Sequence, residues 1–249
     1  MALSLKRRSE PKPKPDQMTL IEHLTELRRR VLICALAFMV TATVAFLVYR
    51  PILSFLQHPY CQINPKHCGF YIAGPLDGLS LRIKIAAYGG LFLSAPVLLW
   101  ELWRFITPGL NPKEKKYAIP FIVASITLFS AGVLVAYVTF PHALSFLTHI
   151  GGPSLNQIFD PLKYLSLILL MMTIFGLTFE FPVLLVSLEV AGVLSPKQLS
   201  SWRRWAIIVI VVVAGVITPS SDPFSMMALA VPLYVFYEVS IVIGKIIHR

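Results

Sequence analysis

Carboxylates occupy three places where they could bind a cation or carry a proton. Glu26 precedes consecutive arginines in His23-Leu-Thr-Glu-Leu-Arg-Arg-Arg30, and Glu114 lies in a basic cluster. Glu180 lies next to the middle of a long apolar run. A charge at the centre of a membrane span costs roughly 2.5–3.5 kcal/mol, so such residues are functional by default. Pairing with neighbouring lysines for Glu114, and with a neighbouring helix for Glu180, remain the plainer alternatives.

Covalent catalysis is not favoured, because the sequence has no G-x-S-x-G or H-E-x-x-H pattern and no Ser/His pair in an apolar run. We expect no cofactor. A polar segment holds Cys61 and Cys68, with two histidines nearby. If this segment lies outside the cell, a disulfide is the preferred interpretation. A zinc site is less favoured because the spacing matches no standard pattern, and a free thiol pair is the third alternative.

Six apolar runs must position these side chains. Hydrophobic residues make up 56% of the 249 residues and charged residues 14%, against about 25% charged in soluble domains. We expect a disordered basic tail over 1–17 and loops over 50–80 and 141–161. Pro96 and Pro182 are expected to have structural roles within spans. The fold class is all-α, a single domain over 18–249 whose membrane spans lie at about 31–49, 81–103, 117–140, 165–190, 202–218 and 224–244.

The positions of the basic residues predict the orientation. With the amino terminus inside, 17 of the 22 Lys and Arg residues fall on the cytoplasmic side, which is the bias of the positive-inside rule. Both termini are therefore expected in the cytoplasm. The formal net charge of +10 is explained by this clustering, so nucleic acid is not an expected partner.

The segment before the first span is expected to be an amphipathic helix. Thr19 and Glu22 form a capping-box pattern, and the leucines that follow make one apolar stripe. Glu22, Glu26 and Arg29 project from the other side. A plain interfacial anchor is the alternative interpretation.

Three motifs together resemble the TatC family, the receptor subunit of the twin-arginine protein translocase. They are H-L-x-E-L-R before the first span, W-x-F-I-x-P-G-L-x-x-x-E after the second and F-G-x-x-F-E-x-P in the fourth. The resemblance covers about residues 20–244. It implies six spans in a concave, cup-like arrangement in the inner membrane of a bacterium or archaeon. It further implies recruitment of TatA/TatB-type subunits, a homo-oligomer, contact with membrane lipids and export of folded proteins driven by the proton-motive force.

The resemblance also implies roles for individual residues. The family's two arginine-contacting glutamates fall on Glu26 and Glu114, and this agrees with carboxylate chemistry, because a guanidinium pairs bidentately and lysine cannot. An acid in the last outside loop falls on Asp222, whereas the polar residue expected shortly afterwards is Met226. The expected signal-peptide set is completed by Phe105, Glu22 and Arg28, and the expected partner set consists of Glu180, Asp222 and Met226.

A proton-coupled small-molecule transporter is the competing hypothesis, with Glu180 as its titrating group. It predicts a site at the membrane midplane with further polar residues facing Glu180, and it predicts broken helices. The nearby sequence offers only Thr173, Thr178 and Ser187.

Overall fold

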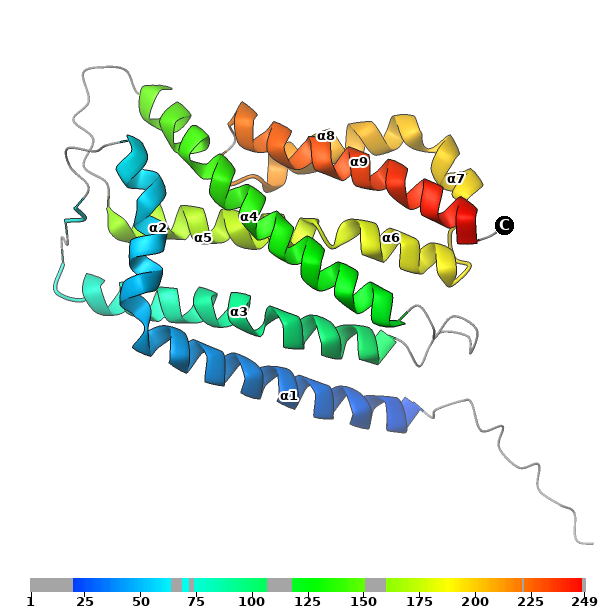
Figure 1. The fold of residues 1–249 in the computed structure, drawn as a ribbon, viewed down its shortest axis with the longest axis horizontal. Coiled ribbons are helices and arrows are strands. Elements are labelled where there is room, and N and C mark those ends of the chain that lie inside the picture. Colours follow the sequence, from blue (N-terminus) through cyan, green and yellow to red (C-terminus); the bar gives the residue numbers. More distant parts are fainter. Residues whose placement is uncertain are drawn as a thin grey trace, which may run out of the picture.

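The structure, a computed structural model, describes residues 20–63, 69–71, 74–106, 118–150, 160–220 and 222–247, without the side chains of Leu20 and Glu22. In this part of the chain all regular secondary structure is helical, as Figure 1 shows. The helices are α1 (Leu20–Leu47), α2 (Tyr49–Ile63), α3 (Asp77–Ile106), α4 (Ala118–Ile150), α5 (Pro161–Thr178), α6 (Phe181–Val190), α7 (Pro196–Ser201), α8 (Arg203–Ile217) and α9 (Pro223–Ile247).

Within the described residues, five helical segments are long and apolar enough to cross a membrane: His23–Leu47, Asp77–Ile106, Ala118–Ile150, Pro161–Val190 and Pro223–Ile247. The fifth predicted span, 202–218, corresponds to α8, whose 15 residues reach only about 22 Å against a hydrocarbon core of ~30 Å. The prediction of a polytopic, all-helical protein is confirmed.

The helices form an extended row, with α1, α3 and α5–α6 side by side and α9 and α8 beyond them (Figure 1). Helix α4 crosses this row and contacts α3, α5 and α9. The start of α1, the end of α3 and the end of α9 share one end of the bundle. We name this the Glu26 end. The opposite end, where α3 begins and α2 lies across the row, is the Arg82 end. That the Glu26 end faces the cytoplasm stays a prediction.

Small residues bring α1 and α3 into close contact. A Cβ atom built on Gly90 would lie 2.7 Å from the Cβ of Ala42, so this crossing tolerates only glycine. The Thr41 hydroxyl donates a hydrogen bond of 2.9 Å to the Gly90 carbonyl. Small residues and interhelical hydrogen bonds of this kind are how helices associate inside lipid. Helix α3 continues through both Gly90 and Pro96.

The fourth span is broken in its middle. Helix α5 ends at Thr178, α6 begins at Phe181, and Pro182 lies in the first turn of α6. Proline lacks an N–H and suits the first turn of a helix, so Pro182 fits the break. Glu180 is the residue that directly precedes α6, and the break therefore sets its position.

Two loop predictions, over 50–80 and 141–161, were wrong. Helix α2 occupies the first part of 50–80, and α4 continues to Ile150. Helix α2 buries Leu56 and Tyr60, which are spaced one helical turn apart, so its pattern is that of an amphipathic helix without a long apolar run. Cys61 in α2 is disulfide-bonded and Cys34 is free. Cys68 lies outside the described residues, so the Cys61–Cys68 pairing stays a prediction.

Candidate ligand-binding site at the Glu26 end

Arg30 is held between two carboxylates that come from different helices. Its Nε donates a hydrogen bond of 3.1 Å to Oε1 of Glu26, one turn earlier in α1, and its Nη2 also pairs with that oxygen. Its Nη1 donates to Oε2 of Glu101 in α3 at 2.9 Å. Glu26, Arg30 and Glu101, which we call the arginine cluster, therefore connect the start of α1 with the end of α3.

The arginine cluster is largely shielded from water. The side chains of Arg30 and Glu101 are 12% and 11% exposed, and that of Glu26 is 22% exposed. Charges interact more strongly in such surroundings than on an open surface. Two carboxylates and one guanidinium leave one net negative charge. Moreover, Oε2 of Glu26 is buried and has no hydrogen-bond partner among the described residues, so the cluster has both a charge and an acceptor to offer a second cation.

An aromatic pair adjoins the arginine cluster. The Phe105 ring stacks on the His23 ring with centroids 4.4 Å apart and an interplanar angle of 16°. Phe105 is one turn beyond Glu101 in α3, and His23 is one turn before Leu27 in α1. Stacked rings give the cluster an apolar flank that could cover the stem of a bound side chain.

The other expected signal-peptide residues are only partly placed. Arg28 is exposed in α1. Glu114 lies outside the described residues, as does the side chain of Glu22. Glu26 and Phe105 thus both lie where the start of α1 meets the end of α3, and the proximity of Glu114 to them remains a prediction.

Sequence reasoning missed Glu101 and the role of Arg30. Glu101 stands near the end of an apolar run, where a charge usually marks the interface with water. Two signals were nevertheless available: Arg30 follows Glu26 by four residues, which is the spacing of a helical ion pair, and Glu101 precedes Phe105 by four residues on one helical face.

A second feature surrounds Glu180 at the break between α5 and α6. Its Oε1 atom is buried and has no hydrogen-bond partner in the described part of the chain. The Ser125 hydroxyl of α4 lies beside this carboxyl and accepts a hydrogen bond of 2.6 Å from the Trp103 indole. Glu180 also lines a cavity of about 290 Å³ whose other walls are mainly aliphatic side chains of α5, α6, α8 and α9.

Asp222 and Met226 lie where α9 begins. Asp222 is fully buried, accepts a 2.8 Å hydrogen bond from the Ser225 N–H through Oδ1, and accepts the Ser220 hydroxyl through Oδ2. This is the geometry of a helix N-cap. Met226 packs against the core near Gly215 of α8. Both residues therefore support the packing of α8 on α9, and neither lines the cavity beside Glu180.

The fold and the arginine cluster together define a multi-pass membrane protein with two carboxylates and one arginine largely buried together at one end. The family model of the Sec-independent protein translocase protein, TatC, matches residues 22–232. The TatC protein of Frankia casuarinae is 40% identical over 94% of this chain and 67% of its own length. That of Aquifex aeolicus is 36% identical over 93% of this chain and 97% of its own length.

The chain belongs to the TatC family. It also resembles the crystal structure of a twin-arginine translocase receptor, TatC, with a TM-score of 0.75 and 35% identity over 92% of this chain and 100% of that one. The protein is thus a multi-pass inner-membrane component of the Sec-independent translocation system. This family is one of translocase components, not of enzymes. The match does not favour the small-molecule transporter hypothesis.

Proposed function

We propose that this chain is a receptor that binds the paired arginines of a signal peptide at the Glu26 end and then engages single-span TatA/TatB-type subunits for export. The observation that carries the proposal is the arginine cluster. It already holds one guanidinium, that of Arg30, and it keeps Oε2 of Glu26 buried with no described partner.

Exchange of partners explains how a peptide arginine could enter. An incoming guanidinium takes Glu26, while Arg30 remains bound to Glu101. No buried charge is then left without a counter-ion, a state that costs several kcal/mol. Glu101 is therefore proposed as a positioning residue, because it holds Arg30 while Glu26 changes partner.

The specificity of this site for arginine follows from geometry. A planar guanidinium presents five N–H donors and can bond two acceptors at once, whereas an ammonium group acts as a point charge. The stacked rings of His23 and Phe105 provide a flat surface beside it. We expect Glu114 to supply the second carboxylate.

Binding of a labelled Arg-Arg signal peptide to the purified protein in nanodiscs tests this function. Glu26→Gln should weaken binding of the Arg-Arg peptide much more than binding of its Lys-Lys version. Glutamine has no negative charge and only one acceptor oxygen, so it cannot pair bidentately with a guanidinium. Glu238→Gln is a matched control, since Glu238 forms an ion pair of 2.8 Å with Arg203 in α8 outside the arginine cluster. Equal losses for both peptides would contradict bidentate recognition.

The cavity beside Glu180 is proposed as a contact for the transmembrane helix of a TatA/TatB-type subunit. Its walls are aliphatic and Oε1 of Glu180 is buried without a described partner. A polar group on a neighbouring helix would satisfy that oxygen, which lipid chains cannot do.

A further inference from the structure

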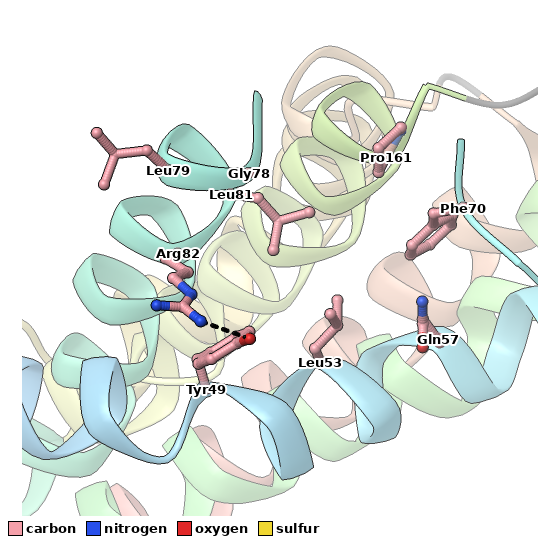
Figure 2. A pocket seen from close by; sticks show the side chains of 9 residues that line it. All are labelled: Tyr49, Leu53, Gln57, Phe70, Gly78, Leu79, Leu81, Arg82 and Pro161. Carbon is pink, nitrogen blue, oxygen red and sulfur yellow. Dashed lines mark hydrogen bonds between the residues drawn. The ribbon is translucent and has the colours of Figure 1, made fainter. Parts of the chain in front are cut away.

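A second cavity lies at the Arg82 end, opposite the arginine cluster. It has a volume of about 540 Å³, within the usual range of ligand sites. Helices α2 and α3 form most of its walls, and the start of α5 closes one side, as Figure 2 shows. Its polar side chains are those of Arg82, Tyr49 and Gln57, and its apolar ones include Leu53, Phe70 and Leu81.

The Arg82 guanidinium is fixed at the edge of this cavity. Its Cζ lies 3.9 Å from the centroid of the Tyr49 ring, and its Nη2 donates a hydrogen bond of 2.7 Å to the Tyr49 hydroxyl (Figure 2). The stacked cation is thereby held in one orientation. A guanidinium has five N–H donors, and this single bond to Tyr49 leaves most of them available.

Nearby carboxylates do not neutralise Arg82. Among the residues that the structure describes, Arg82 forms no ion pair. Asp77, five residues before Arg82, accepts the Gly74 N–H at 2.7 Å, and Asp160, next to Pro161 of the cavity wall, accepts the Leu162 N–H at 2.9 Å. Arg82 is therefore a half-buried cation with spare donors and no described counter-ion, and it is suited to bind an anion.

Two further cations lie at the Arg82 end, although neither lines the cavity. The Nε of Arg50 lies 3.5 Å from the same Tyr49 hydroxyl. Lys84, half a turn beyond Arg82 in α3, donates to the Leu162 carbonyl at 3.3 Å and to the Ser166 hydroxyl. Neither forms an ion pair with a described carboxylate. Arg82 lines the cavity, and the other two cations add to the positive potential of this end of the bundle, which attracts anions.

The cavity opens beside exposed aliphatic side chains of α3. Leu79 lines it and is 53% exposed, and Ile83, one turn further along α3, is 54% exposed. Helix α3 is long and apolar enough to cross the membrane, so we expect its first turns to lie where headgroups meet hydrocarbon. An occupant there can place an anionic group on Arg82 and apolar chains along Leu79 and Ile83.

We propose that the Arg82 cavity binds the phosphodiester headgroup of an anionic phospholipid. Phosphate and guanidinium match in charge and in bidentate geometry. Tyr49 positions the guanidinium and Gln57 provides a further polar contact for the headgroup. The acyl chains lie against the exposed aliphatic side chains of α3. The site is separate from the arginine cluster and does not depend on the function proposed for it.

Native mass spectrometry of the purified protein tests this proposal, with phosphatidylglycerol titrated against phosphatidylcholine. We expect the unmodified chain to retain phosphatidylglycerol in preference. Arg82→Gln should weaken that retention roughly tenfold or more, as expected for loss of charge-assisted hydrogen bonds. Arg204→Gln is the matched control, because Arg204 is an exposed arginine at the start of α8. Equal retention by the Arg82 variant and the control would overturn the proposal.

Two further measurements keep the proposal testable. Tyr49→Phe keeps the ring and removes only the hydroxyl that orients Arg82, so it should fold normally and weaken phosphatidylglycerol retention by a few fold. Unchanged retention would contradict the positioning by Tyr49 on which the site depends. Glycerol phosphate separates a lipid site from a site for soluble phosphate. It should fail to displace the lipid, and displacement at equal concentration would refute a membrane ligand.

Discussion

Glu101→Gln tests the partner exchange in the arginine cluster. In the unmodified chain, Arg30 is shared by Glu26 and Glu101, and the cluster carries one net negative charge. The glutamine variant makes that charge zero and leaves Arg30 with Glu26 as its one acidic partner in the described cluster. An incoming guanidinium must then compete with Arg30 for Glu26. We therefore expect weaker binding of an Arg-Arg signal peptide.

The size of the loss follows from the charge that is removed. Unit charges 4 Å apart interact by about 4 kcal/mol at an effective dielectric constant of ~20, and at twice that separation by about 2 kcal/mol. The low exposure of Arg30 and Glu101, 12% and 11%, limits screening by water and salt. A loss of about 2 kcal/mol corresponds to roughly a 30-fold increase in Kd.

A second substitution makes this test specific. Arg30→Gln, added to Glu101→Gln, removes the competitor and returns the cluster to one net negative charge, now on Glu26. Binding should recover most of the roughly 30-fold loss, because Glu26 again offers one unpaired negative charge and the two substitutions are coupled. Fluorescence anisotropy with a labelled peptide in nanodiscs measures both variants. A purely structural role for Glu101 predicts no recovery, so a double variant as weak as Glu101→Gln would refute partner exchange.

Three other substitutions test the remaining features. Glu180→Ala should leave Arg-Arg peptide binding intact and lower the co-purification of a TatA-type subunit; unchanged co-purification would argue against the proposed helix contact. Asp222→Ala should lower the free energy of unfolding by about 1–2 kcal/mol through loss of the N-cap of α9. Asp222→Asn keeps an acceptor oxygen and should lower the free energy of unfolding by less. Thermal unfolding in detergent measures both variants. Gly90→Ala should destabilise the α1–α3 contact by about 1–3 kcal/mol, because its Cβ would meet Ala42. Gly78→Ala, whose Cβ meets nothing within 4 Å, should be close to neutral in the same measurement, and equal losses would exclude the close contact as the cause.

The membrane-spanning helices could be predicted because an apolar run of about 20 residues is long enough to cross the hydrocarbon core and is uncommon in soluble proteins. Helix α2 could not be predicted in this way, since it buries one face through residues such as Leu56 and Tyr60 and leaves the other polar. Its prolines and its position between two spans favoured a loop. Periodicity of 3–4 residues was the available signal, and it is weaker over 15 residues than an apolar run over about 20.

The arginine cluster shows why part of the site could not be predicted. Glu26 has a recognisable motif, and its pairing with Arg30 follows from helical spacing. The contribution of Glu101 depends on the close packing of α3 on α1, which Gly90 and Thr41 permit well away from the cluster itself. A contact between residues 71 positions apart is set by that packing and by no local pattern.

The end of α3 joins the two proposed functional regions through two residues of one helical turn. Glu101 faces α1 and holds Arg30, whereas Trp103 faces α4 and donates to Ser125, which lies beside Glu180. Because these two residues share one rigid helical turn, a shift of α3 that accompanies exchange of the Arg30 partner would also move the indole against Ser125. Packed side chains of α3 and α4 therefore connect peptide binding at the Glu26 end with subunit binding beside Glu180. If peptide binding changes the affinity for the subunit, subunit binding must change the affinity for the peptide by the same factor.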